Sequence, residues 1–292
     1  MRIVGIHGIN QHRSTRVELV EAWTGALEAG LVKAGLVGSV APLHLDVAYY
    51  ADLYVTHRVQ WKSLDDPAAE LDEVAQELIL EWDASGLDHA DSLDDAGRFE
   101  HTEPGAGAVE IKGLSVPATP LAVQAAVHRL AASPGLQGFG VTGVRRLARH
   151  LHAYLCYEDA RELTAARVTE AIGDGVDVLI GHSMGSVVAY EWLHNNPDRQ
   201  PPLLITIGSP LGCGPVRSRL RPPASVPGSG RWVNLAATHD PIAWPKRLAD
   251  VFGSAVEDDR VPFRFWAHSA RTYLQAAQTA AAVASVAPET PT

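Results

Sequence analysis

A short apolar run that ends in a serine between two glycines most restricts what this chain can fold into. Residues 177–196 read DVLIGHSMGSVVAYEWLHNN. The first letters predict a buried strand, and the last predict a helix that stops before Pro197. Gly181 and Gly185 allow a helix and a neighbouring strand to approach the turn closely. Two interpretations stay open: an ordinary turn, or a strained elbow that presents the hydroxyl of Ser183 to a cleft.

The start of the chain predicts a second strand and a parallel sheet. Residues 1–6 have the composition of a strand, residues 15–34 carry apolar side chains at helical spacing, and residues 43–50 alternate like a strand. Gly35 and Gly38 close the helix. A strand, a helix and a strand in this order predict a right-handed crossover between parallel strands.

The remaining chain divides into a helical middle and a returning α/β pattern. We expect residues 51–158 to form a helical cap or lid, inserted into an α/β core of residues 1–50 and 159–292. Within the cap, the spacing predicts a helix at 67–83, a loop at 84–117 and a helical block at 120–155 with a Pro/Gly break at 134–140. In the core we expect helices at 159–172, at 184–196 and from about 270, and strands at 176–181, 202–208, 231–237 and 261–267.

Composition limits the partners and the compartment. The chain of 292 residues has a net charge of −10, which argues against nucleic acid or an anionic membrane as the main partner. It lacks both the apolar run of a membrane span and the apolar core of a signal peptide. Cys156 and Cys213 suggest no disulfide framework. We therefore expect a cytoplasmic protein with no integral membrane segment, and the sequence leaves its oligomeric state open.

A serine nucleophile needs a base, and few residues after Ser183 qualify. A histidine must take the hydroxyl proton, and a carboxylate must orient that histidine. Only His194, His239 and His268 follow. His194 lies late in the elbow helix and His239 adjoins the candidate acid, which leaves His268, after the last predicted strand, as the base. A structural alternative is that His268 caps the final helix.

Asp240 is the candidate acid. No Asp or Glu stands between Asp198 and Asp240, and the strand WVNLAAT runs directly into the segment HDPIAW. Its carboxylate is expected at the carboxyl edge of the sheet, where parallel sheets bind ligands. The alternative is an Asx-turn before the following proline. Three later aspartates are the fallback acids, the last two of them expected at the wrong end of the sheet: Asp250, Asp258 and Asp259.

The first predicted strand ends in IHGIN and could supply an oxyanion hole. An oxyanion needs two fixed N–H donors. One candidate is the backbone N–H of Met184, and the other is that of Ile9, with Asn10 as the second choice. The alternative is a glycine-rich turn without this role. Four further positions are expected to line the site: His7, Gly8, Asn10 and His182.

These motifs occur in an order that resembles the α/β-hydrolase superfamily. IHGIN, IGHSMGS, ITIGSPLG, HDPIA and AHSARTYL look like segments of lipases and inositol-deacylase-like esterases, over residues 1–50 and 159–285. The resemblance implies an α/β-hydrolase fold: a mainly parallel sheet of about six strands in the order 4-3-5-6-7-8, flanked by helices, with a helical cap insertion. It also implies Ser183, Asp240 and His268 as the catalytic triad.

The expected function is that of a serine hydrolase acting on an ester-like bond. The substrate class covers carboxylic esters, thioesters, lactones and lipids, and a cap rich in Leu, Ala and aromatic residues favours a partly apolar acyl group. Two alternatives remain open. One is an acyltransferase or cyclase that uses the same triad, and the other is a non-catalytic ligand-binding protein on the same fold.

The motifs predict no cofactor and no metal site. No H-E-x-x-H or C-x-x-C spacing and no phosphate-binding loop occurs. Arg145, Arg146 and Arg149 form a basic stripe, which is typical of a solvated helix face and could also meet an acidic ligand or a carrier protein. Six histidines of the middle segment are expected to be surface or cap residues and not metal ligands: His57, His89, His101, His128, His150 and His152.

Overall fold

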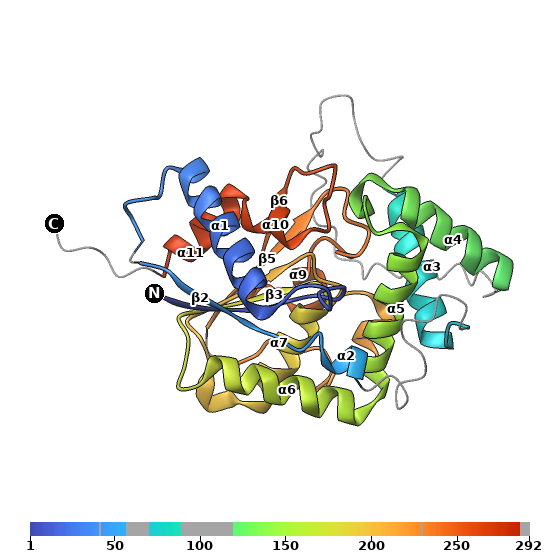
Figure 1. Ribbon diagram of the computed structural model, residues 1–292, viewed down its shortest axis with the longest axis horizontal. Coiled ribbons are helices and arrows are strands. Elements are labelled where there is room, and N and C mark those ends of the chain that lie inside the picture. The colour runs from blue at the N-terminus through green and yellow to red at the C-terminus, as the bar shows by residue number, and fades with distance from the viewer. Residues whose placement is uncertain (41, 57–69, 89–118, 229, 287–292) are drawn as a thin grey trace.

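The protein has an α/β fold built on one six-stranded sheet (Figure 1). The computed structural model describes residues 1–40, 42–56, 70–88, 119–228 and 230–286. The strands are β1 (Arg2–Ile6), β2 (His44–Ala48), β3 (Val178–His182), β4 (Leu203–Ile207), β5 (Arg231–Ala237) and β6 (Val256–Val261). All neighbouring strands are parallel, in the order β2-β1-β3-β4-β5-β6.

Helices cover both faces of the sheet (Figure 1). One face carries α1 (Arg16–Ala34), α10 (Ala270–Leu274) and α11 (Ala277–Ala284), and the other carries α6 (Glu158–Ile172) and α7 (Met184–Asn195). Successive side chains of a strand point to opposite faces. Accordingly, Val178 belongs to the hydrophobic cluster that includes Trp23 of α1, and Leu179 belongs to the cluster that includes Val187 of α7.

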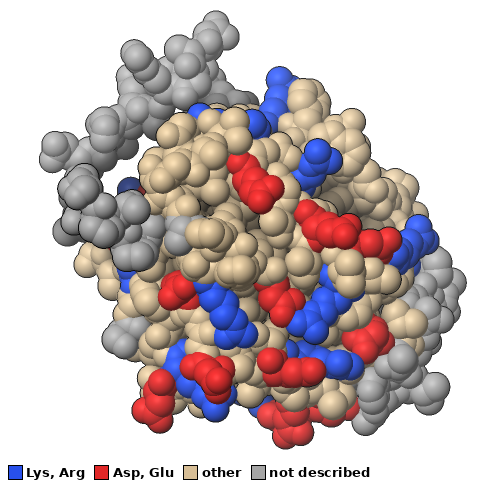
Figure 2. All heavy atoms as spheres, turned by 60° about the vertical axis from the view of Figure 1, so that its left-hand side comes forward, with Lys and Arg blue, Asp and Glu red and all other residues tan. Residues whose placement is uncertain are grey.

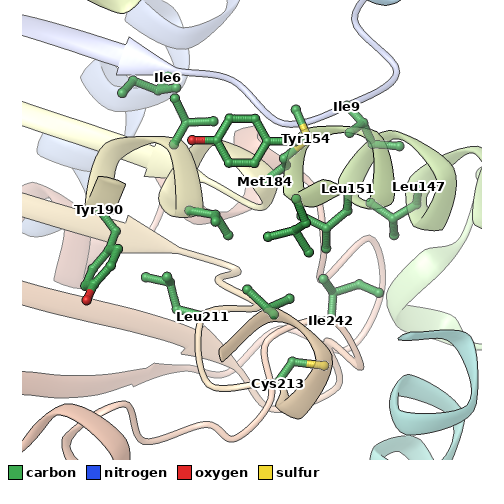
Figure 3. Close-up of a cluster of buried hydrophobic side chains, with 14 of the residues drawn as sticks. Ile6, Ile9, Leu147, Leu151, Tyr154, Met184, Tyr190, Leu211, Cys213 and Ile242 are labelled. Atoms are coloured by element: carbon green, nitrogen blue, oxygen red, sulfur yellow. The ribbon is translucent and has the colours of Figure 1, made fainter. Parts of the chain in front are cut away.

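A second group of helices lies at one end of the sheet (Figure 1). It contains α3 (Glu73–Asp88), α4 (Pro120–Ala132) and α5 (Gly140–Cys156), with a 3₁₀ turn at Pro134–Leu136. Figure 3 shows Leu147, Leu151 and Tyr154 of α5 in the same hydrophobic cluster as Ile9 and Met184. This packing joins α5 to the segments that directly follow β1 and β3.

Four one-turn helices complete the described architecture. They are α2 (Leu53–Thr56), a 3₁₀ turn at Pro197–Arg199, α8 (Gly214–Arg217) and α9 (Ala249–Phe252). The structure confirms the helix expected at 15–34, which begins one residue later. Thr15 caps α1 through a reciprocal pair of hydrogen bonds with Glu18, and Gly35 ends it with φ 70°, a left-handed conformation that favours glycine.

The strand predicted at 261–267 is wrong. β6 ends at Val261, and residues 262–267 form a loop. Pro262 has no N–H to donate to the ladder, so pairing stops there. β6 is the edge strand of the sheet and has the sequence VEDDRV, in which charged side chains protect an otherwise open edge. Asp258 and Asp259 therefore lie within the last strand instead of before it, and His268 follows a loop.

Two predicted helices have different limits. The helix expected at 67–83 is α3, which begins only at Glu73 and continues to Asp88, through the start of the loop expected at 84–117. Residues 67–69 and 89–117 lie outside the described residues. Leu71 is buried but precedes the helix. The C-terminal helix is divided into α10 and α11 because Ala276 has an extended backbone.

The basic stripe on α5 is less exposed than expected, and two nearby histidines are buried. Arg149, His150 and His152 are all buried. α5 packs against α3, α4 and α6, so little of its circumference is free for a solvated face. The ring of His150 stacks on Tyr54, with ring centroids 5.0 Å apart. The solvated position expected of Arg149 is therefore wrong. His150 and His152 lie among the helices of the segment expected to form the cap, and His57, His89 and His101 lie outside the described residues.

Charges of both signs share one face of the surface, and the helices and cysteines give no sign of a membrane span or a disulfide within the described residues. Acidic and basic side chains are interspersed on the face shown in Figure 2. Within the described ranges, no helix has the length and apolarity to cross a membrane. Both cysteines are free thiols, with Cys156 exposed and Cys213 buried.

Candidate active site

The candidate site lies where the order of the strands reverses. The chain passes from β1 to β2 on one side, and then to β3 on the other side of β1. The helices that follow β1 and β3, α1 and α7, cover opposite faces of the sheet (Figure 1). Such a switch point leaves a crevice at the carboxyl ends of the strands. Ile9, after β1, and Ser183, after β3, line the same cleft there.

Ser183 occupies a strained elbow between β3 and α7. Its φ of 54° and ψ of −127° are disfavoured for any residue with a Cβ atom. The turn also needs its glycines. A Cβ atom at Gly185 would lie 2.1 Å from the carbonyl oxygen of Ile6, and one at Gly181 would lie 2.6 Å from Cα of Ser186. The geometry is that of a strained elbow and not of an ordinary turn.

His268 links Ser183 to Asp240. Its Nε2 atom lies 2.9 Å from Oγ of Ser183, and its Nδ1 atom lies 2.9 Å from Oδ2 of Asp240. All three side chains are buried. A nucleophile, a base and an orienting carboxylate at hydrogen-bond distance are the arrangement that activates a serine hydroxyl. The structure thus brings together the three residues that the sequence singled out.

Two of the three fallback acids, Asp258 and Asp250, take other roles. Asp258 accepts hydrogen bonds from the backbone N–H groups of Leu248 and Ala249, at 2.8 Å and 2.9 Å, and so holds the start of α9. Asp250 lies 3.4 Å from Arg247 in an exposed ion pair. Neither carboxylate is hydrogen-bonded to His268, whose Nδ1 is taken by Asp240.

Both oxygens of Asp240 are engaged. Oδ1 accepts the N–H of Ile242 at 3.0 Å, so the Asx-turn that stood as the alternative is present together with the bond to His268. Burial alone would raise the pKa of Asp240. The contacts with His268, the ammonium group of Lys246 and the hydroxyl of Tyr273 outweigh burial and hold that pKa below its usual range. The carboxylate therefore stays ionised.

Tyr273 and Lys246 are residues of the site that sequence reasoning missed. The hydroxyl of Tyr273 donates to Oδ2 of Asp240 at 2.7 Å. Nζ of Lys246 donates to the backbone carbonyl of Asp240, and burial lowers the pKa of this lysine to about 8. A lysine in the apolar segment PIAWPK is a usable signal, because a buried ammonium needs a partner. No comparable signal marks Tyr273.

The two expected oxyanion donors stand on either side of the elbow. Ile6 of β1 pairs with Gly181 of β3. This register places the loop that follows β1, which contains Ile9, next to Ser183. Met184 is the first residue of α7, so its N–H has no acceptor within the helix. No described residue accepts a backbone hydrogen bond from the N–H of Ile9. Two N–H groups are thus available beside the nucleophile.

The other expected lining residues divide into two groups. Asn10 and His182 line the cleft that contains Ser183, while His7 and Gly8, together with Asn10, border a smaller cavity beside it. Asn10 has a positive φ of 65°, and its Oδ1 atom is buried with no hydrogen-bond partner among the described residues. Gly8 still limits the site, because a Cβ atom there would lie 2.9 Å from Cβ of Ser183.

His7 and His182 fix the backbone around the triad. Burial lowers the pKa of His7 to about 4 and that of His182 to about 3, so both rings are neutral near pH 7. Nε2 of His7 accepts the N–H of Tyr50 at 3.2 Å. Nε2 of His182 lies 3.1 Å from the carbonyl oxygen of His268, to which it must donate. The bond from His182 fixes the backbone of the proposed base, His268.

The cleft above Ser183 has a volume of about 900 Å³, which suits a small-molecule ligand. Part of its wall is aromatic. The ring centroid of Phe139 lies 5.9 Å from that of His268. Trp266, which also lines the cleft, is 52% exposed and has a positive φ of 54°. Across the described parts of the chain, no group of three or more His, Cys, Asp or Glu residues could hold a metal ion.

Comparisons with known proteins do not place the chain in a family. No protein-family model matches it, and searches of curated proteins and of solved structures give no significant match. The chemistry of the site must therefore be inferred from its geometry.

Proposed function

We propose that this protein is a serine hydrolase of the α/β-hydrolase type that cleaves an ester-like bond. The buried Ser183–His268–Asp240 chain, with 2.9 Å at each link, is the observation that carries the proposal. Two features support the fold type. The order β2-β1-β3-β4-β5-β6 corresponds to 4-3-5-6-7-8 when β1 is counted as the third strand. The triad also has the chain order Ser, Asp, His that is usual on that fold.

Acylation begins with attack of Oγ of Ser183 on the carbonyl carbon of the substrate. Nε2 of His268 takes the hydroxyl proton as the new C–O bond forms, and Asp240 stabilises the resulting imidazolium. The N–H groups of Met184 and Ile9 donate to the negatively charged oxygen. One such donor contributes about a hundredfold or more to kcat. His268 then gives the proton to the leaving group as its bond to carbon breaks.

Deacylation repeats the same steps with water. His268 takes a proton from a water molecule that attacks the acyl carbon, and returns it to Oγ of Ser183 when the acyl bond breaks. The products are a carboxylic acid and the free serine. The substrate class is a carboxylic ester, thioester, lactone or lipid, and Phe139 and Trp266 provide an apolar wall for part of it.

Pre-steady-state hydrolysis of para-nitrophenyl butanoate tests this proposal. We expect a burst of para-nitrophenol equal to the enzyme concentration, because the acyl-enzyme forms before it is hydrolysed. Ser183→Ala should abolish the burst, whereas Ser218→Ala, a change at an exposed serine after α8, should leave it intact. A burst that persists in Ser183→Ala would contradict the proposal. Product analysis with an added alcohol separates hydrolysis from acyl transfer.

A further inference from the structure

The cleft has the opposite charge balance from the chain as a whole. The sequence contains 24 Lys and Arg residues and 34 Asp and Glu residues. Among the described residues that line the cleft, Glu18 is the one acid, against Arg13, Arg146 and Arg271. The carboxylate of Glu18 is bound to the first turn of α1, where it accepts the N–H of Thr15 at 2.7 Å. The cleft therefore attracts anions in a protein that otherwise repels them.

The three arginines reach the cleft from three separate segments. Arg13 lies in the loop after β1 that also carries Ile9, Arg146 lies on α5, and Arg271 lies on α10, shortly after His268. This convergence places positive charge around the cleft that contains the candidate nucleophile. The N-terminal turn of α5 also borders the cleft, and the partial positive charge of a helix N-terminus adds to the same potential.

The side chains of Arg13 and Arg271 make no ion pair that stabilises the described structure. Both are exposed, and neither forms an ion pair with a residue in the part of the chain that the structure describes. Elsewhere, structural arginines are paired: Arg16 binds both oxygens of Asp46, and Arg129 binds both oxygens of Asp83. A guanidinium presents a planar fork of donors that matches a carboxylate or a phosphate.

The cleft combines these charges with an apolar wall. Phe139 and Trp266 line it together with the arginines. Trp266 exposes half of its surface and is held at a positive φ. A bulky side chain is rarely found in this conformation, and such strain tends to occur at functional sites. A ligand that fits both features has an apolar part and an anionic group.

We propose that the ester bears a negatively charged group, a carboxylate or a phosphate, that binds at Arg13 and Arg271. This inference rests on the proposed hydrolase function and specifies its substrate class. The ester carbonyl lies at Ser183, the apolar part lies against Phe139 and Trp266, and the anionic group takes no part in bond making. The arginines orient the substrate by charge-assisted hydrogen bonds.

Three para-nitrophenyl esters of equal acyl length test the inference. The acyl chains end in a methyl group, a carboxylate or a phosphonate. For the wild type we expect kcat/KM about tenfold higher for a charged ester than for the neutral one, declining with added salt. Arg13→Gln/Arg271→Gln should remove this preference, and Arg13→Lys/Arg271→Lys should restore part of it. Arg217→Gln, at an exposed arginine that does not line the cleft, should keep the preference.

The outcomes separate the two proposals. A preference for one charged ester identifies the anion as carboxylate or phosphate. Equal kcat/KM for all three esters, or a preference that survives Arg13→Gln/Arg271→Gln, would overturn the anionic substrate while Ser183-dependent hydrolysis stands. Turnover of none of the esters, together with failure of a fluorophosphonate to label Ser183, would overturn both proposals.

Discussion

The hydroxyl of Tyr273 donates a hydrogen bond of 2.7 Å to the same Asp240 oxygen that binds His268. The phenolic oxygen in turn accepts the N–H of Ala237, at the end of β5, at 2.8 Å. The carboxylate is thereby tied to the sheet through a rigid ring, and its free rotation is blocked. Tyr273 is therefore a positioning residue: it acts on the proposed base, His268, through Asp240.

Tyr273→Phe should lower kcat about tenfold and leave KM within about twofold, because a hydrogen bond to a charged group contributes about 1.5–3 kcal/mol. Steady-state kinetics on a para-nitrophenyl ester measure both constants. Tyr154→Phe is the matched control, since this buried hydroxyl donates to Glu191 at 2.8 Å, away from the triad. Equal losses of kcat in the two variants would argue against a positioning role.

Gly8→Ala should slow acylation about a hundredfold or more, because a new Cβ atom 2.9 Å from Cβ of Ser183 must displace the nucleophile or the loop that carries Ile9. Single-turnover kinetics measure the effect. Gly25→Ala is the control: a Cβ atom there meets nothing within 4 Å, and alanine stabilises a helix interior by about 0.5–1 kcal/mol relative to glycine. Unchanged acylation in Gly8→Ala would contradict the described loop geometry.

Asp240→Asn should reduce kcat by about a thousandfold to ten-thousandfold, because an amide cannot hold the tautomer of His268 that accepts the serine proton. Asp250→Asn, at a fallback acid exposed on α9, should have wild-type kcat. Ester hydrolysis compares the two variants. A wild-type rate in Asp240→Asn would transfer the orienting role to another group.

Stability should fall as the pH falls from 6.5 toward 4. Burial holds the pKa of His7 near 4 and that of His182 near 3 in the folded protein. In this window the unfolded chain binds protons that the folded protein does not, so acid favours unfolding. Each histidine contributes a slope of about 1.4 kcal/mol per pH unit.

Urea unfolding at about pH 7.0, 5.5 and 4.5 measures this slope, because these values lie on both sides of the ordinary pKa of histidine, about 6.5. His182→Gln should reduce it by the share of one histidine, since the amide keeps a donor for the carbonyl of His268 but does not titrate. His128→Gln, at an exposed position of α4, is the control. A slope that His182→Gln leaves unchanged would show that this ring binds protons equally in the folded and unfolded states, and so that burial does not lower its pKa.

Sequence reasoning located the strands whose side chains are buried on both faces. β1, β3, β4 and β5 are apolar runs, and such runs are typical of the interior of a parallel sheet. The pattern did not predict β6, because an edge strand faces solvent and can be mostly charged. The apolar letters of VPFRFWA suggested a strand, but Trp266 from that segment faces the cleft.

The three residues of the proposed triad could be predicted from the sequence because few candidate acids and bases follow Ser183. Asp240 and His268 were selected by elimination, and the structure places both at hydrogen-bond distance in one chain with Ser183. Tyr273 and Arg13 could not be found in this way. Their positions depend on how α10 and the loop after β1 pack in three dimensions, and neither has a local pattern that indicates it.

Labelling with a fluorophosphonate, read by intact mass, tests the proposed nucleophile most directly. We predict one adduct in the wild type, none in Ser183→Ala and a strongly slowed adduct in His268→Ala, because Ser183 reacts only when His268 takes its proton. A folded wild-type protein that stays unlabelled, or a Ser183→Ala variant that is labelled at the wild-type rate, would contradict the assignment of Ser183 as an activated nucleophile.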